Sequence, residues 1–143
     1  MVFLGEVADE GADDVNDGLA EALIGFEPFP LALAGGGAFG PPEAAKSWWA
    51  GVHDPTWTLP EINRVCLRAA KVAGIRVAAE NFFPHLTLYR GHPRPSPRWL
   101  RSWDDYRGPD WTVNAVHLME SVLQPSGSHY RTLVTHPLNC WAT

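Results

Sequence analysis

The residues best suited to chemistry lie in one segment, the run FPHLTLYR at residues 83–90. A histidine can take or give a proton near neutral pH, and a threonine hydroxyl can donate a hydrogen bond to an anionic oxygen. An arginine binds phosphate through parallel N–H groups. The segment therefore has the residue types for acid–base chemistry on a phosphate group, although an H-x-T triplet also occurs on ordinary half-exposed strands.

We predict that residues 85–90 form a β-strand. Side chains alternate between the two faces of a strand, so His85 and Thr87 should share one face and Arg90 should lie on the other. Residues two apart on a strand are about 7 Å apart, which places the imidazole and the hydroxyl side by side. Arg90 would reach the same phosphate only where the strand twists or ends in a bend.

Residues 35–40, Gly-Gly-Gly-Ala-Phe-Gly, have the spacing of a loop that binds dinucleotide phosphates. Such a loop needs a helix that begins inside the motif, so that helix N–H groups meet the pyrophosphate. Here Pro41 and Pro42 follow at once, and no acidic ribose-binding residue follows about 20 positions later. We therefore predict a flexible or tightly turned loop over residues 35–42, and no nucleotide cofactor.

The histidines and cysteines match no metal motif. No two histidines have H-E-x-x-H spacing, and His129 and His136 could share a metal only through the fold. Cys66 and Cys140 are too few for a zinc cluster or a disulfide framework. Cys66 lies on the apolar stripe of a predicted helix, where a buried thiol is a simpler interpretation than a nucleophile. We predict no metal.

Length and composition indicate one globular domain, because 45% of the 143 residues are apolar. The net charge of −5, from 11 basic and 16 acidic side chains, excludes a protein that holds nucleic acid by general positive charge. It does not exclude a small pocket that binds one phosphate. No apolar run approaches the roughly 18 residues of a membrane span, so we expect a cytoplasmic protein without membrane contact.

The predicted elements alternate in type along the chain. Strands are predicted at residues 1–5, 29–34, 46–53, 85–90, 111–120 and 129–135. Helices are predicted at residues 14–25, 58–73 and 96–106, with a loop at 6–12. Thr58 and Glu61 fit a capping box, and Ser96 before Pro97 fits a helix cap. Mixed elements with tight late turns predict an α+β fold with mostly antiparallel strands.

Several segments together resemble the two-histidine phosphoesterases, in the branch of 2′-5′ RNA ligases or RNA 2′,3′-cyclic phosphodiesterases. Residues 83–90 resemble the second of that family's two H-x-T signatures. The other matching positions are Val2 to Val7, Gly35, Gly37, Ala38, Phe39, Pro41, Trp48 to Val52, Leu118, Ser121, Leu123, Gly127, Tyr130 and Leu133. The resemblance covers nearly the whole chain, in the family's order.

The resemblance implies a single domain over residues 1–143, with two lobes of antiparallel sheets and flanking helices around a central cleft. Each lobe would offer one H-x-T strand to that cleft. One histidine would take a proton from water while the other protonates the departing 3′-oxygen, so that an RNA 2′,3′-cyclic phosphate opens to a 2′-phosphate. The reverse reaction would be ATP-independent 2′-5′ ligation of RNA, and the family needs neither metal nor cofactor.

The resemblance also assigns roles to residues. It makes His85 an acid or base, Thr87 a hydrogen-bond donor to the phosphate and Arg90 a cation that binds the phosphate. Tyr130 matches a substrate-binding position of the family, but packing would equally explain a tyrosine there.

The family's first H-x-T would stand before Val2, and no other histidine of this chain is followed two residues later by threonine. We therefore expect a first lobe that is incomplete at its N-terminus, in a truncated chain. One alternative is an inactive short variant that binds RNA ends or nucleotide phosphates with half a site. Another is a phosphodiesterase for small cyclic nucleotides. The physiological RNA, the direction of reaction and the oligomeric state stay open.

Overall fold

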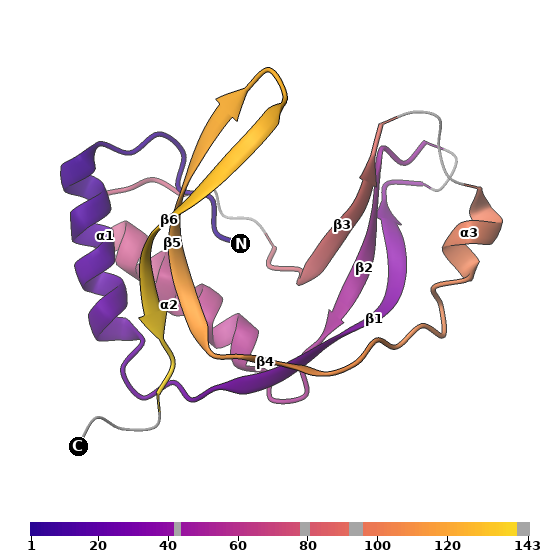
Figure 1. Cartoon of the computed structure of the whole chain (residues 1–143), viewed down its shortest axis with the longest axis horizontal. Coiled ribbons are helices and arrows are strands. Elements are labelled where there is room, and N and C mark those ends of the chain that lie inside the picture. Colours follow the sequence, from indigo (N-terminus) through magenta and orange to yellow (C-terminus); the bar gives the residue numbers. More distant parts are fainter. Residues whose placement is uncertain (42–43, 78–80, 92–95, 140–143) are drawn as a thin grey trace. The chain divides into compact units, whose positions relative to one another are not determined.

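The computed structural model describes residues 1–41, 44–77, 81–91 and 96–139. The chain forms two compact units, each built from segments that are distant in sequence (Figure 1). Unit 1 comprises Met1–Phe29, Pro60–Glu80 and Val113–Thr143, and unit 2 comprises Pro30–Leu59 and Asn81–Thr112. Cys140 and His92 lie outside the described residues.

Unit 2 is built on a four-stranded sheet with the order β3-β2-β1-β4. The strands are β1 (Phe29–Phe39), β2 (Ser47–His53), β3 (His85–Arg90) and β4 (Trp111–Val113). Strand β2 pairs antiparallel with both β1 and β3. The predicted α+β class with antiparallel pairing is confirmed, and the segment 85–90 is a strand as predicted.

The prediction of a loop at residues 35–42 is wrong for residues 35–39, because β1 continues through the glycines to Phe39, and Pro42 lies outside the described residues. Gly35 takes a φ of +65° at a β-bulge, a conformation that favours glycine. A Cβ on Gly36 would overlap Trp103, and a Cβ on Gly37 would overlap the indole of Trp49. Gly36 and Gly37 therefore allow two tryptophans to pack against the strand, whereas Gly35 allows the bulge.

The two faces of this sheet carry different aromatic groups. On one face Trp48, which is 1% exposed, contacts Trp99 with ring centroids 5.7 Å apart. Trp99 contacts Trp103, and Trp103 contacts Tyr106. This row of rings is the packed back of the sheet, so the chemistry-bearing side chains must use the other face.

Helix α3 (Pro97–Arg101) supplies Trp99 to this row. The Ser96 hydroxyl accepts a hydrogen bond from the Trp99 N–H at 3.3 Å, which confirms the predicted cap. The helix is shorter than the predicted 96–106, because turns replace it from Ser102 onward.

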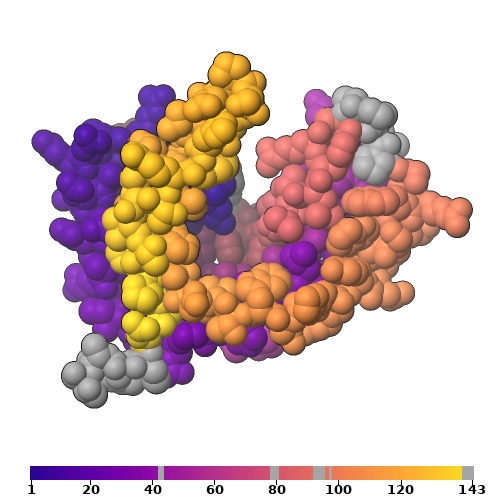
Figure 2. Space-filling view, viewed as in Figure 1, coloured from indigo at the N-terminus to yellow at the C-terminus, as the bar shows by residue number. Residues whose placement is uncertain are grey.

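Unit 1 packs α1 (Asp9–Ala22) and most of α2 (Thr58–Val72) with the hairpin of β5 (Ala115–Gln124) and β6 (Gly127–Pro137). Its buried hydrophobic residues are Val15, Leu19, Leu23, Phe29, Ile62, Ala69, Ala70 and Leu138. The tip of the hairpin extends beyond the helices (Figure 2). Its exposed apolar side chains include Val122 and Leu123.

Three local predictions differ from the structure. Residues 1–5 belong to no strand in the described part of the chain. Helix α1 begins at Asp9 rather than near residue 14, because acidic residues in its first turn favour the positive end of the helix dipole. At α2 the expected capping box is replaced by Asp54, whose carboxylate accepts from the Leu59 N–H at 2.7 Å, while Glu61 pairs with Arg64.

No helix among the described residues is long and apolar enough to cross a membrane.

Candidate active site

Strand β3 contains a β-bulge that decides which side chains share a face. Trp48 pairs with Tyr89 and Trp49 pairs with Thr87, so Leu88 has no partner on β2. Residues that pair across two strands point to the same face of the sheet. The extra residue therefore moves every side chain beyond it to the face opposite the one that simple alternation predicts. The simple alternation predicted from the sequence is therefore wrong after Thr87.

Because of the bulge, His85, Thr87 and Arg90 lie on one face, opposite the packed back of the sheet. No twist or bend at the strand end is needed to bring Arg90 to that face. The β2 partners of these three residues are every second residue of their own strand, namely Gly51, Trp49 and Ser47.

A group of aromatic rings surrounds the His85 imidazole on this face. The ring of Phe39 meets it edge-on, with centroids 4.9 Å apart, and Phe83 stacks beside it at 5.9 Å. Trp49 lies 6.4 Å from the imidazole and packs against Phe83. The imidazole is therefore held in position while remaining exposed to solvent.

The His85 ring makes one hydrogen bond, from Nδ1 to the backbone carbonyl of Phe83, at 2.8 Å. A carbonyl oxygen can only accept, so Nδ1 carries the proton. In the neutral ring Nε2 then has a free lone pair and can accept a proton. Nε2 has no hydrogen-bond partner among the described residues.

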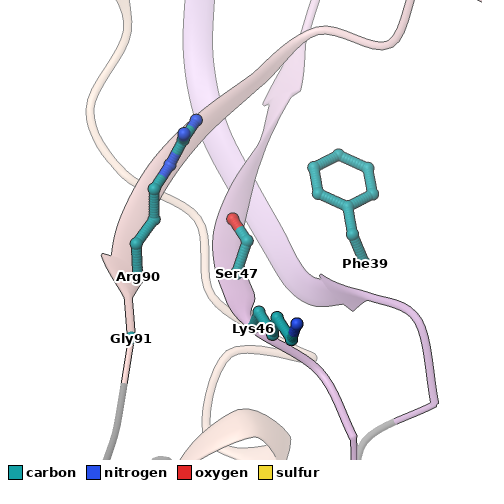
Figure 3. A pocket seen from close by; sticks show the side chains of 5 residues that line it. All are labelled: Phe39, Lys46, Ser47, Arg90 and Gly91. Atoms are coloured by element: carbon teal, nitrogen blue, oxygen red, sulfur yellow. The ribbon is translucent and has the colours of Figure 1, made fainter.

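Thr87 and Arg90 have the donors that a phosphate needs. In the described part of the chain, neither the Thr87 hydroxyl nor the Arg90 guanidinium makes a hydrogen bond or ion pair. Arg90 lines a pocket of about 440 Å³ together with Phe39, Lys46, Ser47 and Gly91 (Figure 3). The arrangement can transfer a proton beside a bound anion.

Other candidate residues fall elsewhere. Tyr130 lies in unit 1, on β6, with 56% of its surface exposed, and its role stays a prediction.

Cys66 is half-buried on α2, and burial raises the pKa of its thiol, which disfavours the nucleophilic thiolate. His129 is hydrogen-bonded to Ser126. The described residues contain no group of three or more His, Cys, Asp or Glu that could hold a metal ion.

The comparisons with known proteins identify the family of the chain. The model of the 2′-5′ RNA ligase superfamily matches residues 2–124. The chain belongs to the 2′-5′ RNA ligase superfamily. The predicted resemblance is thereby confirmed.

Curated relatives of this superfamily carry the name of an enzyme. The chain is 32% identical over 135 residues to the RNA 2′,3′-cyclic phosphodiesterase of Aeropyrum pernix, a match that covers 92% of the chain and 76% of that relative. It is 29% identical to the RNA 2′,3′-cyclic phosphodiesterase of Archaeoglobus fulgidus, covering 93% of the chain and 74% of the relative. The prediction of an enzyme is confirmed by these names.

Solved structures of the superfamily share the fold. The crystal structure of TT0787 of Thermus thermophilus aligns with a TM-score of 0.71 and 25% identity, over 95% of this chain and 74% of that one. The fold of this superfamily member is thus a known one.

The sequence assigned no role to three residues that surround this site. Trp49 and Phe83 pack beside His85, and Lys46 lines the pocket beyond it. The three consecutive glycines could have indicated the position of Trp49. A large ring that packs closely on a strand requires a residue without a side chain there. Nothing in the sequence distinguishes Lys46 from Lys71, the other lysine of the chain.

Proposed function

We propose that this chain opens the 2′,3′-cyclic phosphate at the end of an RNA strand and leaves a 2′-phosphate. The observation that carries the proposal is the common face of His85, Thr87 and Arg90, with Nε2 of His85 free to accept a proton. The name shared by the two curated relatives supports the same reaction.

The proposed step is an attack of water on phosphorus as the bond to the 3′-oxygen breaks. Nε2 of His85 accepts a proton from the water. Thr87 and Arg90 donate to the phosphate oxygens on which negative charge grows, as preorganised donors do. This sequence holds no second H-x-T to supply an acid, so the departing 3′-oxygen takes its proton from solvent water. With an RNA 5′-hydroxyl in place of water, the same groups would form a 2′–5′ linkage without ATP.

Tyr130 is proposed as a further substrate-binding residue. Its ring is exposed on the hairpin, and a phenol can donate a hydrogen bond to phosphate or stack on a base. Replacement by phenylalanine would separate a hydrogen bond from packing.

A binding role without turnover is the second candidate, and one observation favours it. His85 is the only histidine in the chain with a threonine two residues later. Loss of one of two acid–base groups costs about 10²- to 10⁴-fold in rate. Such a chain would still hold a cyclic phosphate through Thr87 and Arg90.

The deciding experiment measures hydrolysis of an RNA oligomer that ends in 2′,3′-cyclic phosphate, with the product identified against 2′- and 3′-phosphate standards. We expect a 2′-phosphate product, and a loss of about 10²- to 10⁴-fold in His85→Ala. His129→Ala, at an exposed histidine of the hairpin tip, is the matched control and should keep the wild-type rate.

Three outcomes would count against the proposal. A 3′-phosphate product would mean that the 2′-oxygen departs instead. Equal rates in His85→Ala and the wild type would remove His85 from the chemistry. Binding of the cyclic end without turnover by the wild-type chain would establish the second candidate instead.

A further inference from the structure

The pocket that Arg90 lines also contains Lys46 and Ser47, which have no role in the reaction described above. It measures about 440 Å³ and is lined by Phe39, Lys46, Ser47, Arg90 and Gly91. Phe39, Ser47 and Arg90 are register partners on three neighbouring strands, so the pocket floor is one row of the sheet. The pocket lies within unit 2, on the face that carries His85.

The charge of this pocket is opposite to that of the chain. In the part of the chain that the structure describes, its lining contains two cations and a hydroxyl but no carboxylate. Among the described residues, neither Lys46 nor Arg90 has an acidic partner. The whole chain carries a net charge of −5, so two unpaired cations in one concave place form a local anion site.

Phe39 joins this pocket to the candidate active site. Its ring lines the pocket and also contacts the His85 imidazole at 4.9 Å. In Figure 3 the Arg90 side chain runs back along β3, toward the start of that strand, while the Lys46 ammonium lies on the other side of Ser47. The charged groups of Arg90 and Lys46 therefore lie at different positions along this face of the sheet.

We propose that this pocket binds the phosphodiester next to the cyclic end of the RNA, an inference that rests on the proposed function. A 2′,3′-cyclic phosphate closes the 3′ end of a strand, so its only neighbouring phosphate lies on the 5′ side. Lys46 and Ser47 donate to the two free oxygens of that phosphate, and Arg90 remains for the cyclic phosphate. The pocket thereby selects an RNA oligomer over a cyclic mononucleotide.

The test compares two substrates that differ by this phosphate. Adenosine 2′,3′-cyclic phosphate has one phosphate, and the dinucleotide ApA with a 2′,3′-cyclic end has two. We expect a higher kcat/KM for the dinucleotide in the wild type. Lys46→Gln should lower the ratio of the two kcat/KM values about fivefold, the effect of one exposed ion pair at the upper end of its range. A methylphosphonate linkage, which removes the charge, should lower the wild-type ratio similarly.

Lys71→Gln is the matched control, because Lys71 is an exposed lysine on α2 in unit 1 and should leave the ratio at its wild-type value. An unchanged ratio in Lys46→Gln, or equal rates on both substrates in the wild type, would overturn this inference. Neither result would affect the proposed function, which fails if His85→Ala keeps its activity, if the product is a 3′-phosphate, or if the wild-type chain binds the cyclic end without turnover.

A binding experiment covers the case of a chain without turnover. Calorimetry would compare the wild type and Lys46→Gln with two product analogues, adenosine 2′-phosphate and ApA 2′-phosphate. Tighter binding of the dinucleotide, lost in Lys46→Gln, supports the pocket as a second phosphate site. Equal affinities for both analogues would overturn it.

Discussion

At the scale of single residues, His136 differs from the exposed histidines because it is buried without a partner for its ring nitrogen. Its side chain is 7% exposed, and Nε2 has no hydrogen-bond partner within the described residues. Burial lowers the pKa of His136, since the charged ring loses its hydration. The folded chain therefore favours the neutral imidazole at this position.

The pKa shift of His136 predicts how stability depends on pH. Above its ordinary pKa of about 6.5 the ring is neutral in both states, and the full stability is present. As the pH falls below that value, the unfolded chain binds a proton that the folded chain resists, so the free energy of unfolding decreases. Urea unfolding of the wild type and of His136→Leu, between about pH 7.5 and pH 5.5, should show a smaller decrease in the variant.

His129→Leu is the control for the other titrating groups, because His129 is exposed at the hairpin turn. It should lose as much stability on acidification as the wild type. Equal pH dependence in His136→Leu and the wild type would remove His136 as the cause.

At the scale of elements, the sequence was informative where periodicity and chemistry agreed. The strand at 85–90 was predicted with its observed bounds, because alternating apolar residues and a preceding proline mark it clearly. The face of the sheet on which Arg90 lies could not be predicted, because it depends on a bulge, and the bulge depends on how β3 pairs with β2. The strand at Gly36 and Gly37 could not be predicted from the sequence, because their partners Trp103 and Trp49 are distant in the sequence.

The bulge in β3 can be tested by deleting Leu88. In the shortened strand, His85, Thr87 and Arg90 would stand at regular alternating positions and still share one face. We expect the deletion variant to keep hydrolysing the cyclic phosphate, whereas Arg90→Ala should lose about ten- to a hundredfold, as for a hydrogen bond to a charged group. Circular dichroism would verify that both variants are folded. If a folded deletion variant is as impaired as Arg90→Ala, the expectation is contradicted. The bulge would then be needed for something other than placing Arg90 on the same face as His85 and Thr87.

At the scale of the whole molecule, the charge distribution limits how the chain can hold RNA. A protein with a net charge of −5 gains nothing from contacts spread along the strand. Its exposed basic residues include pairs that are already neutralised, such as Arg107 with Asp110 and Arg131 with Glu120. Affinity must then come from the few cations without acidic partners, and in unit 2 these include Arg90 and Lys46.

This limit predicts a weak dependence of RNA binding on salt. Each phosphate neutralised on a single strand contributes a slope of about −0.7 to the logarithm of affinity against the logarithm of salt concentration, so two phosphates give about −1.4. Titration of a longer RNA oligomer with a 2′-phosphate end, at several salt concentrations, should give this shallow slope in the wild type. Lys46→Gln should reduce it to about −0.7, because one phosphate contact is lost. A slope several times steeper would mean that the RNA is held along its length by cations outside the pocket, and the RNA strand rather than its end would then be the recognised feature.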